Sequence, residues 1–418
     1  MSRVEERPVA TNYGPIEVLI PEARQRARRR RTVTGLVVLG ALIVIAGVLV
    51  AVGGNEIIPK PSSANGPGSA VATNVTTDNV ANLAGSNTIT ASGSHVWVAI
   101  DNTNWTSHPL TTSYEVVELN SSNGRLVRVI HNKSGDLTWP GALAVSGTRL
   151  WVADNQYWNV TELNAGNGRL VRVIRARADG LADPGAIAVS GGHVWVANSH
   201  VGANSVTELN ASNGSLVRVI NAKADGLNGP SAIVVSGSHV FVLNATGDSI
   251  TELDANSGEL IRVINSRAGC CAPRHGTFEW AAPVALAVRG QHLWVVNQHN
   301  DANGATSESS VAEFNVSNGS LVRDIKAKAD GLNIPRAIAV SRGHVWVDNG
   351  NNTITELNAN NGSLVRVINV KLDPKGLNSA DGLAVSGPYI VVLNIYSGQK
   401  SSVSVINASN GRLVRVIQ

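Results

Sequence analysis

The sequence predicts an all-β fold: a seven-bladed β-propeller of four-stranded antiparallel blades, preceded by one transmembrane helix. Three observations lead to this prediction. One motif recurs seven times from about residue 88 to the C-terminus, at steps of 44 to 54 residues. Each copy reads as four short strands, and one uncharged apolar run lies near the N-terminus. Self-similarity at such a period is typical of propellers and solenoids.

The third copy shows the strand pattern best. Its strands are expected at Ala188–Ser190, His193–Asn198, Ser205–Asn210 and Ser215–Ile220, which are rich in Val and Ile and are separated by turn residues. The last turn reads Asn-Gly in six copies and Ser-Gly in the fourth. Since these residues tolerate positive φ, the dipeptide between two β runs predicts a hairpin.

An aromatic residue recurs on the second strand of the motif. It is Trp97, Trp151, Trp195, Phe241, Trp294 and Trp346, with Val391 in the last copy. Four antiparallel strands with one recurrent aromatic are typical of a propeller blade. We interpret these aromatic side chains as packing between blades rather than as ligand contacts.

The segments VWVAN (194–198), SVTELNASNG (205–214), LVRVI (216–220) and GPSAIVVS (229–236) resemble the YVTN-type propeller repeats, and more loosely the NHL repeats. The resemblance covers residues 88–418. It implies a seven-bladed β-propeller and a repeat protein. It does not imply an activity, because such repeats serve many unrelated functions.

The N-terminal part predicts a membrane anchor. Val33–Val52 is twenty residues without a charge, enough to cross a bilayer as a helix. The run Arg28–Arg31 precedes it, which favours a cytoplasmic N-terminus and a propeller outside the cell membrane. The expected domains are a basic tail (1–31), a transmembrane helix (32–52), a flexible linker and possible closing segment (53–87) and the propeller (88–418). A cleaved signal peptide is the alternative, with an unusually long apolar region.

The net charge of +4 belongs entirely to the tail, where residues 1–31 hold eight Arg and four Glu. The remaining 26 basic and 26 acidic residues cancel. The propeller therefore has no charge excess of the kind that binds nucleic acid, and we predict no nucleic-acid partner. We also predict no cofactor.

A Glu and an Arg recur ten residues apart across the Asn-Gly turn. The Glu is residue 118, 162, 208, 252, 313 or 356, with Val405 in the seventh copy, and the Arg is residue 128, 172, 218, 262, 323, 366 or 415. If the hairpin loop is odd-numbered, with Gly as its left-handed residue, each Glu faces its Arg across the strand pair. We predict this facing arrangement.

Repetition separates the fold from function, because a position shared by all blades is explained by the fold. One face of the propeller is constant in length: it carries the turns between strands one and two and between strands three and four. A polar position on it is held by His95, Arg149, His193, His239, His292, His344 and Tyr389. Equivalent positions on seven blades are spread around a disc and do not converge on one ion, so we predict no metal site there.

The opposite face, which we call the irregular face, varies in length. Between strands two and three, blades 1 and 5 use 17 and 15 residues, against 6 to 10 elsewhere. The connection from blade 4 to blade 5 spans 25 residues from Ile264 to Arg289, against 16 to 18 for the others. All three enlargements fall on this face.

The aromatics outside the repeat fall there too, with polar neighbours. The candidate binding residues are Trp105, His108, Trp139, Tyr157, Trp158, Arg274, His275, Trp280, His299 and Asp301. Exposed aromatics beside adaptable polar groups are typical of protein hot spots and of surfaces that stack on sugar rings. We therefore predict a binding module for a protein or glycan partner. Alternatively, each aromatic caps its own loop, in which case the propeller is a plain spacer.

Two further features leave alternatives open. Cys270 and Cys271 are adjacent and are the only cysteines, so outside the cell they form a vicinal disulfide or remain thiols able to hold a soft metal with His275. We favour the disulfide, as a loop staple. The alternative function is a propeller-fold lyase or hydrolase at the channel mouth of the same face, with a general base such as His299 or Glu308. We assign no catalytic residue.

Overall fold

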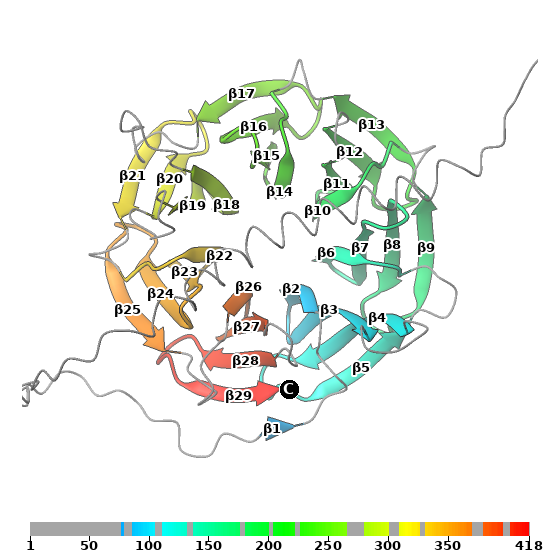
Figure 1. The fold of residues 1–418 in the computed structure, drawn as a ribbon. Coiled ribbons are helices and arrows are strands. Elements are labelled where there is room, and N and C mark those ends of the chain that lie inside the picture. The colour runs from blue at the N-terminus through cyan, green and yellow to red at the C-terminus, as the bar shows by residue number, and fades with distance from the viewer. Residues whose placement is uncertain are drawn as a thin grey trace, which may run out of the picture. The chain divides into compact units, whose positions relative to one another are not determined.

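The computed structural model describes residues 77–78, 86–104, 111–131, 137–175, 180–199, 204–221, 226–265, 280–300, 309–326, 331–369, 379–395 and 402–417. These residues form seven antiparallel sheets arranged in a ring, which is a seven-bladed β-propeller (Figure 1). Each blade contributes four strands that follow one another in the chain and in space, from the centre of the ring to its rim.

The strands have the following bounds. Blade 1 holds β2 (Ser86–Ser92), β3 (His95–Asn104), β4 (Thr111–Asn120) and β5 (Leu126–His131); blade 2 holds β6 (Pro140–Ser146), β7 (Arg149–Asp154), β8 (Asn159–Asn164) and β9 (Leu170–Arg175). Blade 3 holds β10 (Pro184–Ser190), β11 (His193–Asn198), β12 (Ser205–Asn210) and β13 (Leu216–Asn221); blade 4 holds β14 (Pro230–Ser236), β15 (His239–Asn244), β16 (Ser249–Asp254) and β17 (Leu260–Asn265). Blade 5 holds β18 (Trp280–Arg289), β19 (His292–Asn300), β20 (Ser310–Asn315) and β21 (Leu321–Lys326). Blade 6 holds β22 (Pro335–Ser341), β23 (His344–Asn349), β24 (Thr353–Asn358) and β25 (Leu364–Asn369); blade 7 holds β26 (Ser379–Ser386), β27 (Tyr389–Ile395), β28 (Ser402–Asn407) and β29 (Leu413–Ile417).

The expected strands of the third copy agree with these bounds except at the first. β10 begins at Pro184 rather than Ala188. Its pairing with β11 extends toward the N-terminus as far as Pro184, across a β-bulge between Pro184 and Ala186. The proline is tolerated there because it stands at the first residue of an inner edge strand, where its missing N–H breaks no ladder.

The hairpin between the third and fourth strands differs from the predicted odd-numbered loop: the interval at the turn is even, and a β-bulge on the fourth strand supplies the extra residue. In blade 3, Glu208 pairs with Arg218 but the next residue, Leu209, pairs with Leu216, so the register shifts by one. The extra residue is Val217, while Gly214 lies within the turn with φ of 76°, and its N–H donates to the Asn210 carbonyl at 2.7 Å. Glycine suits this left-handed position because it has no Cβ.

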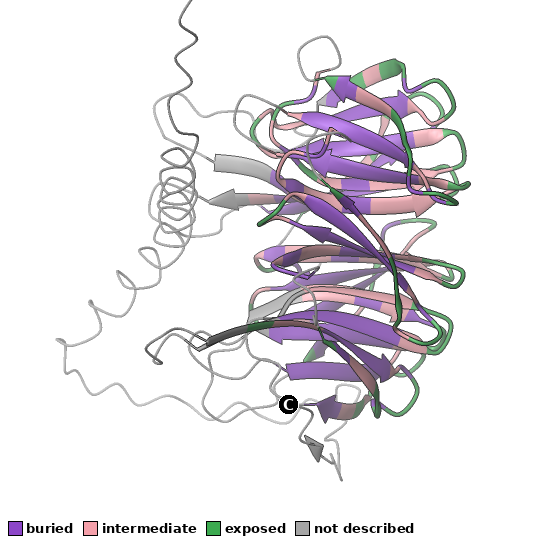
Figure 2. Cartoon of the chain, turned by 90° about the vertical axis from the view of Figure 1, so that its right-hand side faces the viewer, coloured by how far each residue is buried: buried purple, intermediate pink, exposed green. Residues whose placement is uncertain are grey.

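The hydrophobic core lies between neighbouring blades rather than inside one sheet. Trp195 is fully buried and belongs to one cluster with Ile233, Val240 and Val242 of the next blade. The same arrangement recurs around the ring, and the buried residues run along the strands while the turns of the constant face are exposed (Figure 2). The recurrent aromatic therefore packs between blades, as the sequence indicated.

The ring closes without a blade shared between the two ends of the chain. All four strands of blade 1 precede residue 132, and all four of blade 7 follow residue 378. Instead, β1 (Thr77–Asp78) pairs in parallel with β29 and forms a fifth strand outside blade 7. The segment before the propeller thus adds a strand to the last blade, a question that the sequence left open.

No helix among the residues given structure here is long and apolar enough to span a membrane. The predicted anchor, Val33–Val52, lies outside them, as do the tail before it and most of the linker.

Candidate functional site

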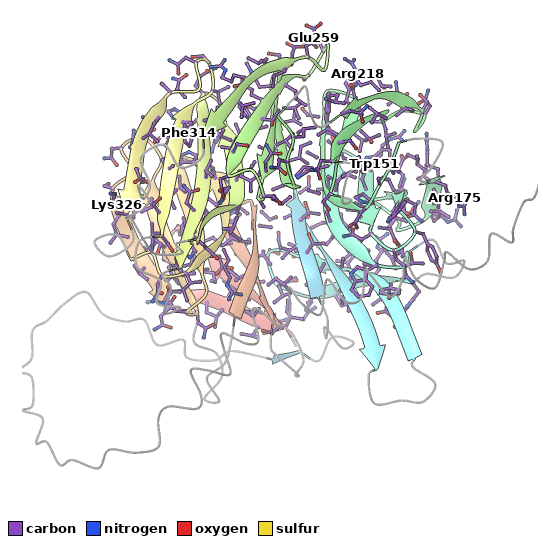
Figure 3. The ribbon with its side chains drawn as sticks, turned by 45° about the horizontal axis from the view of Figure 1, so that its top comes forward. Trp151, Arg175, Arg218, Glu259, Phe314 and Lys326 are labelled. Carbon is purple, nitrogen blue, oxygen red and sulfur yellow. The ribbon has the colours of Figure 1, made fainter. Side chains whose placement is uncertain are left out.

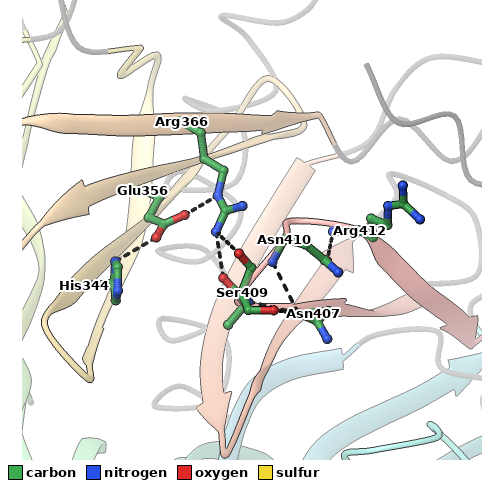
Figure 4. Close-up of polar contacts among 8 residues, drawn as sticks. His344, Glu356, Arg366, Asn407, Ser409, Asn410 and Arg412 are labelled. Carbon is green, nitrogen blue, oxygen red and sulfur yellow. Dashed lines mark hydrogen bonds and ion pairs between the residues drawn. The ribbon is translucent and has the colours of Figure 1, made fainter. Parts of the chain in front are cut away.

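Near the turns of the constant face, each of six blades has a buried Glu that contacts two basic side chains. In blade 4, Glu252 is fully buried on β16. His239 Nδ1 contacts its Oε1 at 2.7 Å, and Arg262 Nε lies 3.0 Å from its Oε2. The predicted facing of Glu and Arg is thus confirmed, and the histidine is a third member that the sequence did not reveal. Figure 4 shows the same triad in blade 6, with His344, Glu356 and Arg366.

Each arginine of these triads also reaches the next blade. Arg262 Nη2 donates to the Ser317 carbonyl of blade 5 at 3.0 Å. Equivalent bonds join Arg128 to Gly166, Arg172 to Ser212, Arg218 to Asn256, Arg323 to Asn360, and Arg366 to Ala408 and Ser409. The triads therefore tie consecutive blades together, which explains why these charges repeat.

Blade 2 carries Arg149 where five other blades have His, and its Nη1 contacts Glu162 and donates to the Ala211 carbonyl at 3.0 Å. The histidines are partners of carboxylates, and each belongs to its own blade. Within the described ranges, no three His, Cys, Asp or Glu side chains gather closely enough to hold a metal ion.

The irregular face has its own repeated polar contact. In blade 3, Asn198 ends β11, is fully buried, and its Nδ2 donates to Thr207 Oγ1 at 2.9 Å. Thr207 in turn donates to the Gly180 carbonyl of the incoming connection at 2.7 Å. The Asn198 carboxamide oxygen accepts the Ala182 N–H at 3.2 Å. This contact recurs in blades 4 and 6 and holds each connection on its blade.

Blade 2 replaces that Asn by a carboxylate, Asp154, which is fully buried. Its Oδ2 accepts the Thr138 hydroxyl at 2.6 Å and the N–H groups of Thr138 and Trp139, the latter at 2.9 Å. Its Oδ1 accepts the N–H groups of Gln156 and Tyr157 at 3.0 and 3.3 Å. A carboxylate only accepts, and here every bond comes from a donor. Asp154 thus fixes two loops at once, and both carry candidate aromatic residues.

The structure brings two of the predicted residues, Trp139 and Tyr157, together through their N–H groups on Asp154, and Trp158 follows Tyr157 in the chain. Trp139 is partly exposed and lies with its ring centroid 6.2 Å from that of Tyr114, at an interplanar angle of 41°. Tyr157 is 53% exposed, so it is the most exposed aromatic side chain of this group. Trp158 is partly exposed and adopts a φ of 55°, an unusual conformation for a bulky residue. We call Tyr114, Trp139, Tyr157 and Trp158 the aromatic cluster.

Tyr114 was not among the residues predicted from the sequence. It falls in the 17-residue interval of blade 1, which was expected to be a loop. Much of that interval is strand, because β3 and β4 continue their pairing as far as Asn104 and Thr111. The strand-like Thr111–Tyr114 sequence was the available signal. Blade 5 is similarly extended, with Trp280 to Pro283 of β18 paired to Asn300 to Asn297 of β19.

The other predicted residues have no described side chain. Trp280 and His299 lie on β18 and β19, at the extended end of the blade 5 hairpin on the irregular face. The remaining candidates lie outside the described residues: Trp105, His108, Arg274, His275, Asp301, Glu308, Cys270 and Cys271.

Comparison with known proteins supports the fold. No family model and no curated protein matches the chain. Among solved structures, hydrazine synthase of Kuenenia stuttgartiensis superposes with a TM-score of 0.58 at 17% identity, over 82% of this chain and 99% of that one. The WD40 domain of Neurospora crassa Pan2 gives 0.57 at 10% identity, over 79% and 91%. The computationally designed Ika8 protein gives 0.52 at 13%, over 81% and 88%. At these identities the similarity establishes the propeller fold alone.

Proposed function

We propose that this protein is an interaction module that binds a protein or glycan partner through the irregular face of its propeller. The observation that carries the proposal is the aromatic cluster. Its two loops are held by one buried carboxylate, Asp154, while Tyr157 projects with 53% of its side chain exposed. Rigid aromatic side chains supply large contact area at low entropic cost, which suits both protein hot spots and sugar stacking.

The cluster also breaks the symmetry of the ring. Asp154 stands where blades 3 to 7 have an Asn, at Asn198, Asn244, Asn297, Asn349 and Asn394, and the bonds of four of these hold strands and connections of their own blade. The carboxylate gathers N–H groups from both loops, as an amide does not. A position that departs from the repeat in order to hold aromatic residues favours binding over a purely structural role.

The finer parts of the proposal rest on the sequence. We propose that Val33–Val52 anchors the chain in the cell membrane with its N-terminus in the cytoplasm, so that the propeller lies outside the cell. We further propose that the blades are of the YVTN repeat type. The propeller fold is compatible with both, and with an interaction module as its use.

A binding experiment tests the proposal directly. The full chain is screened by intrinsic fluorescence and by glycan and protein arrays, beside a variant with Trp139→Ala and Tyr157→Ala. We expect the partner to bind the native chain and to lose at least about 2 kcal/mol with the variant, as is typical for truncated aromatic hot spots. Retention of full affinity by the variant would refute the role of the cluster.

A matched control separates lost contact from lost stability. Leu170→Ala removes a side chain of similar exposure, 47%, from the rim of the same blade. We expect this control to bind as the native chain does, and all three proteins to melt at similar temperatures. The class of ligand that binds, sugar or polypeptide, decides between the two kinds of partner.

A further inference from the structure

The turns of the constant face carry a surplus of positive charge that the composition of the propeller conceals. They and the positions that flank them hold two acidic residues, Asp254 and Glu259, and six arginines, at 125, 149, 169, 289, 342 and 412. Basic and acidic residues cancel over residues 32–418, so the rest of that range carries the matching acidic excess. The constant face is therefore basic although the propeller as a whole is not.

Three of these arginines form an arc over consecutive blades. The residue after the glycine of the turn between strands three and four is Arg412 in blade 7, Arg125 in blade 1 and Arg169 in blade 2, and all three are exposed. The same position is Ser in blades 3, 5 and 6 and Glu259 in blade 4. Blade 4 lies across the ring from blades 7, 1 and 2 (Figure 1). The arginines are therefore gathered on one side of the constant face.

The turns hold the three arginines in the same way. The N–H of each donates to the side-chain oxygen of the Asn two residues before it, at 2.9 Å. Figure 4 shows this bond in blade 7, from Arg412 to Asn410. Arg128 of blade 1 donates to the Gly166 carbonyl of blade 2 at 2.8 Å, which fixes two of the turns beside each other. Within the described ranges, no ion pair engages the guanidinium groups of the arc, so their charge is available to a partner.

Exposed leucines lie beside the arc. Leu126 and Leu170, which follow the arginines of blades 1 and 2, are 44% and 47% exposed, against 37% for Leu216 in blade 3. The turns of this face have the same lengths in all seven blades and lie along one side of the propeller (Figure 2). Basic and apolar side chains together on such a face suit the boundary of a bilayer, where the charges meet the headgroups and the apolar groups reach the acyl chains.

The chain enters the propeller from this same side. β29 begins directly after the constant-face turn of blade 7 and runs toward the irregular face. β1 is parallel to it, with Thr77 opposite Val416, so the N-terminal end of β1 points toward the constant face. The segment that leads back to the proposed anchor, Val33–Val52, therefore joins β1 at its constant-face end, in the blade that carries Arg412.

We propose that the arc of Arg412, Arg125 and Arg169 docks the propeller on a bilayer that carries anionic phospholipid headgroups. Guanidinium groups bind phosphate oxygens through paired hydrogen bonds, and Leu126 and Leu170 add apolar contact at the headgroup boundary. This docking rests on the proposed membrane anchor. It deepens the proposed function, because a docked constant face turns the irregular face, with its aromatic cluster, away from the bilayer.

The test places the full chain in lipid nanodiscs of phosphatidylcholine alone, or with about one third phosphatidylglycerol, and follows hydrogen–deuterium exchange. We expect slower exchange of residues 120–126, 164–170 and 407–413 in the anionic discs only, and loss of this protection at high salt. The variant carries Arg125→Ser, Arg169→Ser and Arg412→Ser, the residue of blades 3, 5 and 6. Each basic residue near an anionic surface strengthens docking about five-fold, so the variant should weaken it about 100-fold and lose the protection.

Two further variants sharpen the test. Lys326→Ser is the control, because Lys326 is an exposed basic residue at the other end of a rim strand, toward the irregular face, and its removal should leave the protection unchanged. Ser215→Arg extends the arc to blade 3 and should strengthen docking about five-fold. All these side chains are exposed, so every variant should keep the native melting temperature.

The outcomes separate the docking from the anchor. Equal exchange in neutral and anionic discs, or full protection of the triple variant, would overturn the docking. Protection of the same turns by inorganic polyphosphate but not by anionic discs would also overturn it, and would assign the arc to a soluble polyanion. Failure of the chain to enter neutral discs would overturn the anchor alone, since exchange with and without added anionic discs still decides the docking.

Discussion

Six of the seven blade interfaces differ from the one that closes the ring. From blades 1 to 6, a buried Glu joins a His or Arg to a second Arg, and that second Arg reaches the next blade. Blade 7 keeps Arg415, which contacts the Gly124 region of blade 1, but has Tyr389 and Val405 in place of the His and Glu. Its interface with blade 1 is built from aliphatic side chains, including Val96, Val98 and Val405.

This difference separates two contributions to the interfaces, the apolar packing of neighbouring blades and the ion pairs of the triads. The closing interface shows that two blades pack closely without a buried carboxylate. The triads of the other six interfaces therefore add something beyond contact area, namely a fixed register between each turn and the next blade. A buried charge is stabilising only where its partners are present, and the closing interface avoids the requirement by having no such charge.

The largest effect is expected from removing a triad carboxylate. Glu252→Ala leaves the guanidinium of Arg262 and the imidazole of His239 without their shared acceptor. Breaking a buried pair in this way costs about 3 to 5 kcal/mol. Denaturant unfolding measures the loss. Glu259→Ala is the control, because that side chain is exposed on the adjoining turn and points outward (Figure 3), and its change should be within about 0.5 kcal/mol.

If Glu252→Ala lowers the free energy of unfolding no more than the control does, the triads add no measurable stability to the apolar interfaces between blades. The closing interface would then be representative of all seven.

The second prediction reverses the experiment at the closing interface. Val405→Glu places a carboxylate opposite Arg415 but among Val96, Val98 and Val391, with a Tyr where its other partner would stand. We expect a loss of about 2 kcal/mol, since a buried polar group is incompletely paired. Adding Tyr389→His supplies the missing partner and should restore about half of it. A double variant no more stable than the single one would show that blade 7 cannot form the triad.

The sequence predicted the architecture well because the fold repeats. Seven copies of one strand pattern left little choice of topology. The facing of Glu and Arg was predicted correctly from their ten-residue interval, although the extra residue is a β-bulge on the fourth strand rather than part of an odd-numbered loop. The role of the histidines was missed because His239 pairs across the sheet with Asp254, while its side chain reaches diagonally to Glu252. The sequence interval between a His and a Glu that meet diagonally does not mark them as cross-strand partners.

The candidate site was less predictable. Trp139, Tyr157 and Trp158 could be identified because they depart from the repeat, but their proximity depends on Asp154, whose bonds join segments some 15 residues apart. Tyr114 was missed because the whole 17-residue interval of blade 1 was taken as a loop, although its last part, from Thr111 to Tyr114, is strand. The repeat predicts the features that the blades share. The arrangement of the loops that differ between blades could be found only from the structure.

The smallest effect concerns a carboxylate that lacks the partners the triads supply. Asp324 lies in blade 5, the blade that also holds the triad of Glu313. Burial raises the pKa of Asp324 above its usual value, and the nearby Ser310 hydroxyl and Lys326 ammonium offset only part of the rise, without a hydrogen bond of normal geometry to either oxygen. The raised pKa means that the folded protein favours the neutral carboxyl.

The contribution of Asp324 to stability is therefore greatest below its unfolded pKa, near 3.8, and is lost as pH rises through its higher folded pKa. Asp324→Asn removes this dependence. At pH 7 we expect the variant to be more stable than the native chain by about 1 kcal/mol, because the carboxylate oxygens are buried without a hydrogen-bond partner and a neutral amide costs less to bury there. The gain should shrink as pH falls through the raised folded pKa and should change no further below about 3.8. Denaturant midpoints at both pH values measure it, and a variant destabilised at pH 7 would show that this carboxylate, like those of the triads, is held by a partner.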